Sequence, residues 1–444
     1  MYITLADLLL TPIYLIIIYV IAFRFKASIK TKNIRRYFIP ALTVKIIGSI
    51  AFGLIFQFYY GGGDTSEYFY HAKVVMSAFE NSFSDGIRLF FGDGNRILDL
   101  LPYIKKMNWY RSSTEYFVVR AATVFGFLCF GNYTVISLLF AVSSFTGIWA
   151  MYKTFIKIHP SLYKEFAIAI FFIPSVFFWG SGLMKDTLTI GALGWLFYGF
   201  YGALVEKRNI LRNIIISFFA AYVIYSVKVY ILLSFLPPAA LWVFIENNNR
   251  IKNKSLRLIL KPIFIVFGFG IALIGATTLT EGNANYDLDN IGERTRINSL
   301  YLSEQQASGS AYHIGTFDGS IGSMIAVAPQ AIIVSLYRPF IWEVRSPIMA
   351  LSALEAMMFI YLTFVIIRKI GLFKMIKIIS TKPILTFCMV FSLVFAFGVG
   401  TNSGNFGTLV RYKIPLMPFY LSALYIMQAY LKRPKKLRRF AVTA

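Results

Sequence analysis

Long apolar runs recur along the whole chain and constrain its fold more than any other feature. Of its 444 residues, 57% are hydrophobic and only 14% are charged, whereas a soluble domain carries roughly 25% charged residues. The runs are about as long as the roughly 20 residues that cross a bilayer as a helix, and much longer than the roughly ten-residue strands of an outer-membrane barrel. The clearest lie near residues 8–23, 40–58, 134–152, 187–204, 260–277, 347–367 and 414–430. The sequence therefore predicts an all-α polytopic membrane protein.

Basic residues indicate which loops face the cytoplasm. The net charge of +24 is concentrated in short loops between the apolar runs. This is the positive-inside pattern of membrane proteins, so we expect no nucleic-acid partner. The basic clusters lie at 24–36, 153–164, 207–212, 250–261, 368–382 and 432–439. The pattern predicts a multi-pass protein of the cell inner (cytoplasmic) membrane, with the N-terminus outside and a basic cytoplasmic tail at 431–444.

Two further apolar segments, 117–131 and 321–337, decide the number of spans. If both crossed the membrane, eleven basic residues between them would move outside in exchange for four. We therefore expect both to dip into or lie along the outer leaflet, although the sequence leaves open whether they span. The prediction is one integral-membrane domain, 1–444, with about eleven transmembrane helices: 8–23, 40–58, 134–152, 166–182, 187–204, 213–227, 230–246, 260–277, 347–367, 384–399 and 414–430.

Two long loops are predicted on the outer side. The first, 59–116, mixes aromatic residues with charges, as expected of helices that lie in the membrane interface. The second, 278–346, is polar over its first forty or so residues, which indicates a mobile loop or lid.

An acidic motif directly follows the second apolar run. Three glycines at 61–63 allow a sharp turn, and Asp64 and Glu67 come next among tyrosines. A carboxylate in the lowered dielectric of the membrane rim is suited to act as a general base toward an acceptor hydroxyl or amine. The alternative is a solvated loop in which Asp64 caps an interfacial helix.

A second acidic motif follows Pro174. This proline ends or kinks a predicted span, and Asp186 then caps the next span with Lys185 beside it. The pair is a candidate for positioning a phosphate and an acceptor, and the alternative is an interfacial salt bridge with a helix cap. The sequence contains no zinc or magnesium motif, so we predict no cofactor; a weakly bound divalent cation would be sought between Asp64 and Asp186.

Two basic motifs are predicted on the outer side, against the positive-inside bias. Arginine binds phosphate through two parallel hydrogen bonds, and aromatic rings stack on sugars or settle at headgroups. An outer anion such as a polyprenyl phosphate or diphosphate would explain both motifs, and the alternatives are interfacial anchoring and pairing with an acid. The candidate lipid-phosphate and substrate residues are Arg338, Trp342, Glu343 and Arg345 in the first motif, and Arg411 and Tyr412 in the second.

These motifs resemble those of the GT-C superfamily of integral-membrane glycosyltransferases, which includes the protein mannosyltransferases and the aminoarabinose transferases. Members carry an acid at the start of the first outer loop, like Asp64, followed by interfacial helices. A later span ends in a proline followed by an acid, like Pro174 and Asp186, and an Arg-Tyr-x-x-Pro-x-x-Pro pattern like that at 411–418 opens a late span. The extra span 8–23 and the absence of a large soluble C-terminal domain depart from some relatives.

The resemblance implies a GT-C-like fold, an acceptor base at Asp64 and a lipid-phosphate contact at Arg411. It also implies a polyprenyl-linked sugar donor, with membrane lipids and other glycan-assembly proteins as partners. We therefore expect a glycosyltransferase that moves a sugar from a polyprenyl-phosphate or -diphosphate donor to an extracytoplasmic glycan, lipid or protein.

Two alternatives stay open. Residues 63–68 (Gly-Asp-Thr-x-x-Tyr) also resemble a motif of the O-antigen and exopolysaccharide repeat-unit polymerases. A lipid-linked glycan transporter or flippase would require polar pairs deep within spans, where the sequence shows little beyond Lys45 and Glu355.

Overall fold

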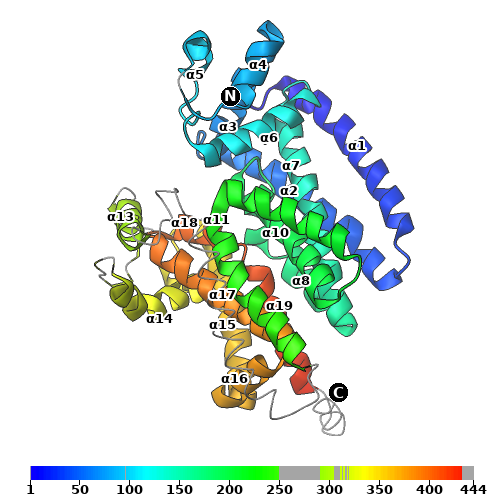
Figure 1. Cartoon of the computed structure of the whole chain (residues 1–444), viewed down its shortest axis with the longest axis vertical. Helices are drawn as coiled ribbons and strands as arrows, with labels where there is room; N and C mark the ends of the chain where they lie inside the picture. The colour runs from blue at the N-terminus through cyan, green and yellow to red at the C-terminus, as the bar shows by residue number, and fades with distance from the viewer. Residues whose placement is uncertain are drawn as a thin grey trace. The chain divides into compact units, whose positions relative to one another are not determined.

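The computed structural model describes residues 2–95, 97–249, 291–304, 311–312, 314–315, 318 and 320–432. Over these residues the chain is helical and forms no strand, apart from one isolated bridge between Ala311 and Asn405 (Figure 1). The predicted all-α class is therefore confirmed.

Several helices are long and apolar enough to cross a membrane. Among the described residues there are seven, or up to eight if one helix pair bent by 68° is a single span. The seven are α1 (Leu5–Ser28), α2 (Lys32–Phe58), α7 (Tyr133–Ile158), α10 (Lys185–Phe200) with its π-helical continuation Tyr201–Val205, α11 (Ile210–Asn249), α15 (Pro347–Ile370) and α17 (Pro383–Asn402). The bent pair is α18 (Phe406–Tyr412) and α19 (Met417–Lys432). The count of about eleven stays a prediction.

Four of the predicted spans need comment. The span 166–182 forms two short helices, α8 (Tyr163–Phe171) and α9 (Pro174–Trp179), because Pro174 lacks an N–H and disfavours helix in the residue before it. The spans 213–227 and 230–246 are two helical stretches within α11, and they meet where Lys228 leaves the helical conformation (φ −149°, ψ 75°). The span 260–277 lies outside the described residues.

The two segments expected not to span form short helices. Residues 117–131 lie largely in α6 (Ser113–Phe127), and residues 321–337 form α14 (Ile321–Tyr337). At 1.5 Å per residue they are about 22 and 25 Å long, short of a hydrocarbon core of about 30 Å. Their lengths agree with the expectation, but their depth in a membrane stays a prediction.

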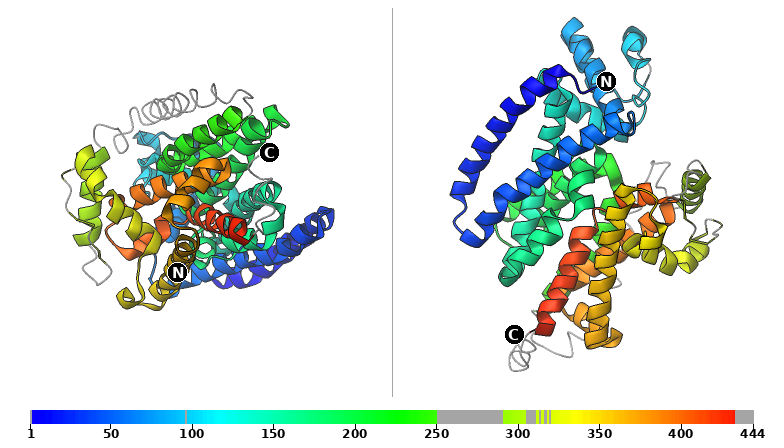
Figure 2. Two further views of the ribbon diagram at one scale, coloured as in Figure 1. Left: turned by 90° about the horizontal axis from the view of Figure 1, so that it is seen from below. Right: turned by 180° about the vertical axis from the view of Figure 1, so that it is seen from behind.

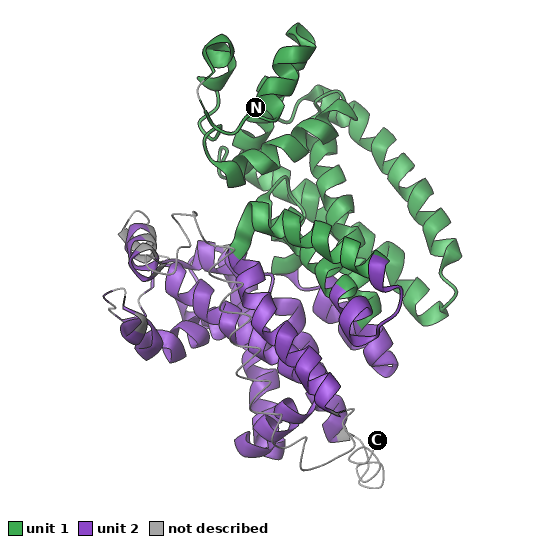
Figure 3. Cartoon of the chain, viewed as in Figure 1, with its two compact units in different colours: residues 1–154, 175–199, 212–229 green, residues 155–174, 200–211, 230–444 purple. Residues whose placement is uncertain are grey.

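The described chain divides into two compact units, each built from separate stretches of sequence (Figure 3). Unit 1 comprises Met1–Thr154, Ser175–Gly199 and Arg212–Val229. Unit 2 comprises Phe155–Pro174, Phe200–Leu211 and Tyr230–Ala444. The single integral-membrane domain expected over 1–444 stays a prediction.

In unit 1, α1 and α2 run antiparallel as a hairpin (Figures 1 and 2). The first predicted outer loop is helical, with α3 (Asp64–Asn81) packed against α4 (Phe83–Phe90) and α6, and with a short turn η1 (Leu98–Leu100) leading into α5 (Leu101–Ile104). Helices α7 and α10 approach so closely that a Cβ on Gly147 would overlap the carbonyl of Gly191. Small residues at such crossings are typical of membrane helices, because they allow backbones into van der Waals contact.

In unit 2, α19 packs against α8, α15 and α17, and α14 lies along α17 (Figure 2). Gly400 makes the contact between α14 and α17 possible, because a Cβ at this position would overlap the backbone of Ala331. The unit is completed by α13 (Ile291–Glu304), α16 (Leu372–Thr381) and the short turns η2 (Pro160–Leu162) and η4 (Ile341–Glu343).

Candidate functional site

The glycine turn after α2 forms as predicted. Gly61, Gly62 and Gly63 have φ angles of +72°, +138° and +142°, which side-chain-bearing residues rarely adopt. Gly63 is the N-cap of α3, and its N–H donates to Ser66 Oγ at 3.0 Å. Asp64 is thus the first helical residue rather than the cap, which corrects the alternative interpretation of this motif.

Asp64 and Glu67 occupy the first turn of α3, where the helix dipole favours negative charge. Asp64 is half-buried, and the side chain of Glu67 is 45% exposed. The motif therefore places two carboxylates on one turn, and that of Glu67 is open to solvent or ligand.

His71 lies one helical turn beyond Glu67 and is not among the site residues predicted from the sequence. Its side chain is fully buried, its Nε2 is 3.4 Å from Glu67 Oε2, and its ring packs edge-on against Trp109 at 5.4 Å between centroids. Burial lowers the pKa of His71 to about 4, so the imidazole is neutral at pH 7. In the sequence, the signal for this contact is the i, i+4 spacing of Glu67 and His71, which makes the two residues neighbours on one face of a helix.

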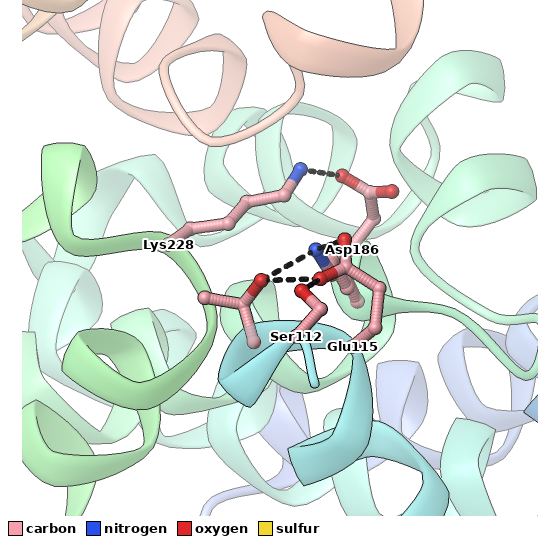
Figure 4. Close-up of polar contacts among 6 residues, drawn as sticks. Ser112, Glu115, Asp186 and Lys228 are labelled. Carbon is pink, nitrogen blue, oxygen red and sulfur yellow. Dashed lines mark hydrogen bonds and ion pairs between the residues drawn. The ribbon is translucent and has the colours of Figure 1, made fainter. Parts of the chain in front are cut away.

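A second polar cluster forms where α6 and α10 begin (Figure 4). Lys185 pairs with Glu115 and donates to Thr114 Oγ1 at 3.1 Å. The hydroxyls of Ser112 and Thr114 also donate to Glu115. Burial raises the pKa of Glu115, but the Lys185 ammonium and these hydrogen bonds outweigh it and hold the pKa below its ordinary value. Glu115 is therefore ionised at neutral pH.

Asp186 forms a separate, buried ion pair with Lys228 (Figure 4). Lys228 Nζ is 2.5 Å from Asp186 Oδ1, and the two side chains are 7% and 1% exposed. Lys228 is the residue at which α11 kinks. Lys185 and Asp186 thus each belong to a salt bridge, as the alternative interpretation proposed, but with partners that the sequence did not identify.

The two partners that the sequence analysis missed, Glu115 and Lys228, each have a recognisable signal in the sequence. Ser112 and Glu115 have the Ser-x-x-Glu spacing of a capping box, which marks a helix start. Lys228 is the one charged residue between Asn213 and Ile245. A lone lysine between two apolar runs is a candidate partner for a buried acid.

In unit 2, Arg338 and Glu343 pair with each other. Arg338 Nε is 3.0 and 3.1 Å from the two oxygens of Glu343, and the Phe340 N–H donates to the same carboxylate at 2.8 Å. Burial raises the pKa of Glu343, but these hydrogen bonds and the charge of Arg338 hold it below its ordinary value. The guanidinium also lies over the ring of Phe406 at 5.1 Å, a cation–π contact.

The neighbouring aromatic and basic residues are more open. Trp342 is 78% exposed and stacks on Phe340 with centroids 4.8 Å apart. Arg345 is exposed as well. These positions fit either a ligand surface or interfacial anchoring, the two interpretations that the sequence left open.

The Arg-Tyr motif lies at the bend between α18 and α19. Arg411 and Tyr412 end α18 and are half-buried. Lys413 is buried, donates to the carbonyl of Arg338 at 3.0 Å and interacts electrostatically with the buried Glu355. Lys413 therefore joins the two basic motifs of unit 2.

The predicted site residues divide between the units. Asp64, Glu67, Lys185 and Asp186 lie in unit 1, whereas the residues from 338 to 345 and at 411 and 412 lie in unit 2. That all of these motifs lie on the outer side stays a prediction. In the part of the chain that the structure describes, no three His, Cys, Asp or Glu side chains form a metal-binding group.

Comparison with known proteins gives no relatives: no family model, curated protein or solved structure matches this chain.

Proposed function

We propose that this chain is a membrane glycosyltransferase. It would transfer a sugar from a polyprenyl-phosphate or -diphosphate donor to an acceptor on the outer face of the cytoplasmic membrane. The observation that carries the proposal is the position of Asp64 and Glu67. They begin a helix that starts six residues after α2, a helix able to cross a membrane, beyond a turn of three glycines.

The proposed reaction uses one of these carboxylates as a base. It accepts the proton of the acceptor hydroxyl or amine while the acceptor atom bonds to the anomeric carbon. The bond from that carbon to the phosphate oxygen breaks, and the polyprenyl phosphate, or the diphosphate of a diphosphate donor, leaves with the electron pair. Arg411 and Arg338 are proposed to stabilise the phosphate, because guanidinium binds its oxygens in a bidentate manner.

The buried pairs suggest a division of roles among the acids. Asp186 is 1% exposed and paired with Lys228, so protonating it would disrupt a buried ion pair. Glu115 is already held by Lys185 and two hydroxyls. We assign Asp186 to holding the start of α10, and on the position of Asp64 and Glu67 at the start of α3 we assign the base to Asp64, with Glu67 beside it.

The test is replacement of Asp64 in cells that lack the native gene. Asp64→Asn is expected to reduce the glycan product by a factor of about 100 or more, the usual contribution of a general base. Product is measured by mass spectrometry of envelope glycans at matched protein level, together with the polyprenyl-linked donor that accumulates. A single-sugar lipid in that pool supports the transferase, whereas a lipid-linked oligosaccharide supports the repeat-unit polymerase.

Asp93→Asn is the matched control, because Asp93 is an exposed loop acid of the same unit. It should leave the product unchanged. Full product from both Asp64→Asn and Arg411→Ala would refute the proposal.

A lipid-linked glycan flippase is the second candidate, favoured by one observation. The ion pair of Lys228 and Asp186 and the buried Lys45 belong to helices apolar enough to cross a membrane. Buried charge in such helices marks transport pathways as well as structural contacts. Purified chain in proteoliposomes distinguishes the two: a flippase moves the lipid-linked precursor between leaflets and forms no glycosidic bond.

A further inference from the structure

We propose that a cavity between α1, α2 and α7 binds a single hydrocarbon chain of a membrane lipid. This site lies within unit 1, and it does not depend on the glycosyltransferase proposal. The cavity has a volume of about 240 Å³ and is lined by residues of all three helices, including Leu8, Thr11, Gly53, Leu54, Tyr133 and Ser137. A cavity of roughly 150 Å³ already holds benzene, so this one accommodates part of a lipid chain.

Most polar side chains of the cavity wall are hydrogen-bonded within the protein, whereas the buried hydroxyl of Thr11 has no hydrogen-bond partner among the described residues. Asp7 accepts from the backbone N–H groups of Thr4 at 2.8 Å and Thr134 at 2.9 Å. Ser49 and Ser137 share a hydrogen bond of 2.8 Å. The surface that faces the cavity is largely apolar, and one unpartnered hydroxyl is fewer than the two to four polar partners that a buried water needs. An apolar occupant is therefore favoured over water.

The mouth of the cavity opens on an apolar surface. Leu8 and Leu54, which line it, are 69% and 43% exposed. Along α1, which contains Leu8, the side chains of Leu5, Leu9 and Ile16 are also exposed. Because α1 and α2 both have the length and composition of membrane spans, we expect lipid to be the medium in contact with this surface. A lipid chain is thus the occupant that can reach the cavity.

The position of the cavity along α2 would place the headgroup of the bound lipid near the glycine turn. Gly53 and Leu54 precede Phe58, the last residue of α2, by about 6–8 Å at 1.5 Å per residue. Tyr133 in the wall also hydrogen-bonds Thr65 of α3 at 2.8 Å. A chain in the cavity would therefore contact the residue that anchors the first turn of α3.

The test uses photoactivatable lipid chains. The full chain is reconstituted in phosphatidylcholine vesicles that contain either a diazirine-tailed phosphatidylcholine or a diazirine-tailed polyprenyl phosphate. After illumination, labelled residues are mapped by mass spectrometry. The expected targets are Ser49, Tyr133 and Ser137, each at most 2% exposed and so hidden from bulk lipid. Labelling in either arm supports the site, and the relative yields identify an acyl or an isoprenoid occupant.

A matched pair of variants tests entry through the mouth. Leu8→Trp should lower labelling of the three wall residues about tenfold, because the larger side chain takes the apolar space that a lipid chain would otherwise bury. Leu9→Trp changes an equally exposed position of α1 that does not line the cavity, and should leave labelling unchanged.

Two results would overturn the proposal. One is a wild-type protein whose wall residues stay unlabelled in both arms while Leu5 and Ile16 are labelled. The other is equal labelling of the wall residues in Leu8→Trp and Leu9→Trp. Both variants change exposed side chains, so loss of folding is not expected to obscure the comparison.

Discussion

His71 lies on α3 with its whole side chain buried, one turn from Glu67 and against the ring of Trp109. Burial disfavours its protonated form and lowers its pKa to about 4 from 6.5. The unfolded chain therefore binds a proton at this residue at higher pH than the folded chain does. Stability from the neutral imidazole is complete above about pH 6.5 and is lost as the pH falls toward 4.

We accordingly predict that His71→Gln weakens the pH dependence of stability. In the wild type the free energy of unfolding should fall by on the order of 2 kcal/mol between pH 6.5 and pH 4. The measurement is the thermal midpoint in detergent micelles across this range. Because the pKa of Glu115 lies below 4.5, the interval from pH 5 to 6.5 isolates the histidine from that carboxyl. An identical pH profile for the variant would contradict the assignment.

Buried charged residues also determine where helices bend and begin, and α11 is the clearest case. The helix is interrupted at Lys228, whose ammonium reaches Asp186 in the first turn of α10. Lys45 acts similarly on the turn before α10, since its ammonium donates to the carbonyl of Gly180 and to Ser144 Oγ at 3.2 Å. Two lysines from distant helices therefore fix both sides of the α10 start.

Lys228→Met is predicted to destabilise unit 1 by about 3–5 kcal/mol, because it removes one partner of a buried ion pair. The double variant Lys228→Met/Asp186→Leu should recover much of the loss, since the uncompensated charge is gone. Thermal unfolding in micelles reports both effects.

Lys157→Met provides the comparison. Lys157 pairs with Glu206, and the Lys157 side chain is 48% exposed. Removing this exposed ion pair should lower the free energy of unfolding by less than about 1 kcal/mol. Equal losses for Lys157→Met and Lys228→Met would contradict the role given to the buried pair.

At the scale of the whole molecule, the arrangement across the membrane decides which groups meet which substrates. The charge distribution predicts that the chain around Lys32 is cytoplasmic and that the turn near Tyr60 is outside. These two positions flank α2, a 27-residue helix about 40 Å long, which is long enough to separate them by a bilayer.

Cysteine labelling in intact cells tests this arrangement. Tyr60→Cys should react with a membrane-impermeant maleimide, whereas Lys32→Cys should react only after permeabilisation. Both native side chains are exposed, and the native Cys129 and Cys388 are buried, so background labelling is low. The reverse pattern would place Asp64 in the cytoplasm and end the glycosyltransferase proposal.

Much of the architecture follows from local sequence properties. The helical class follows from the length of the apolar runs, the broken span from Pro174, and the turn before Asp64 from three consecutive glycines. Each depends on residues adjacent in the chain, whose backbone preferences are visible without knowledge of the fold. Two helices were predicted at 213–227 and 230–246, and the chain does leave the helical conformation between them, at Lys228, although the sequence did not identify this lysine as the break.

The sequence by itself determined that this chain is helical and rich in membrane-length helices, and that acids follow the second of them. Tertiary structure decided which charges pair: Lys185 with Glu115 across 70 positions and Lys228 with Asp186 across 42. It also decided that His71 is buried and that residues of α1, α2 and α7 line one cavity. The physical reason is that pairing and burial depend on contacts between residues far apart in the chain, whereas helix formation and turns depend on neighbours.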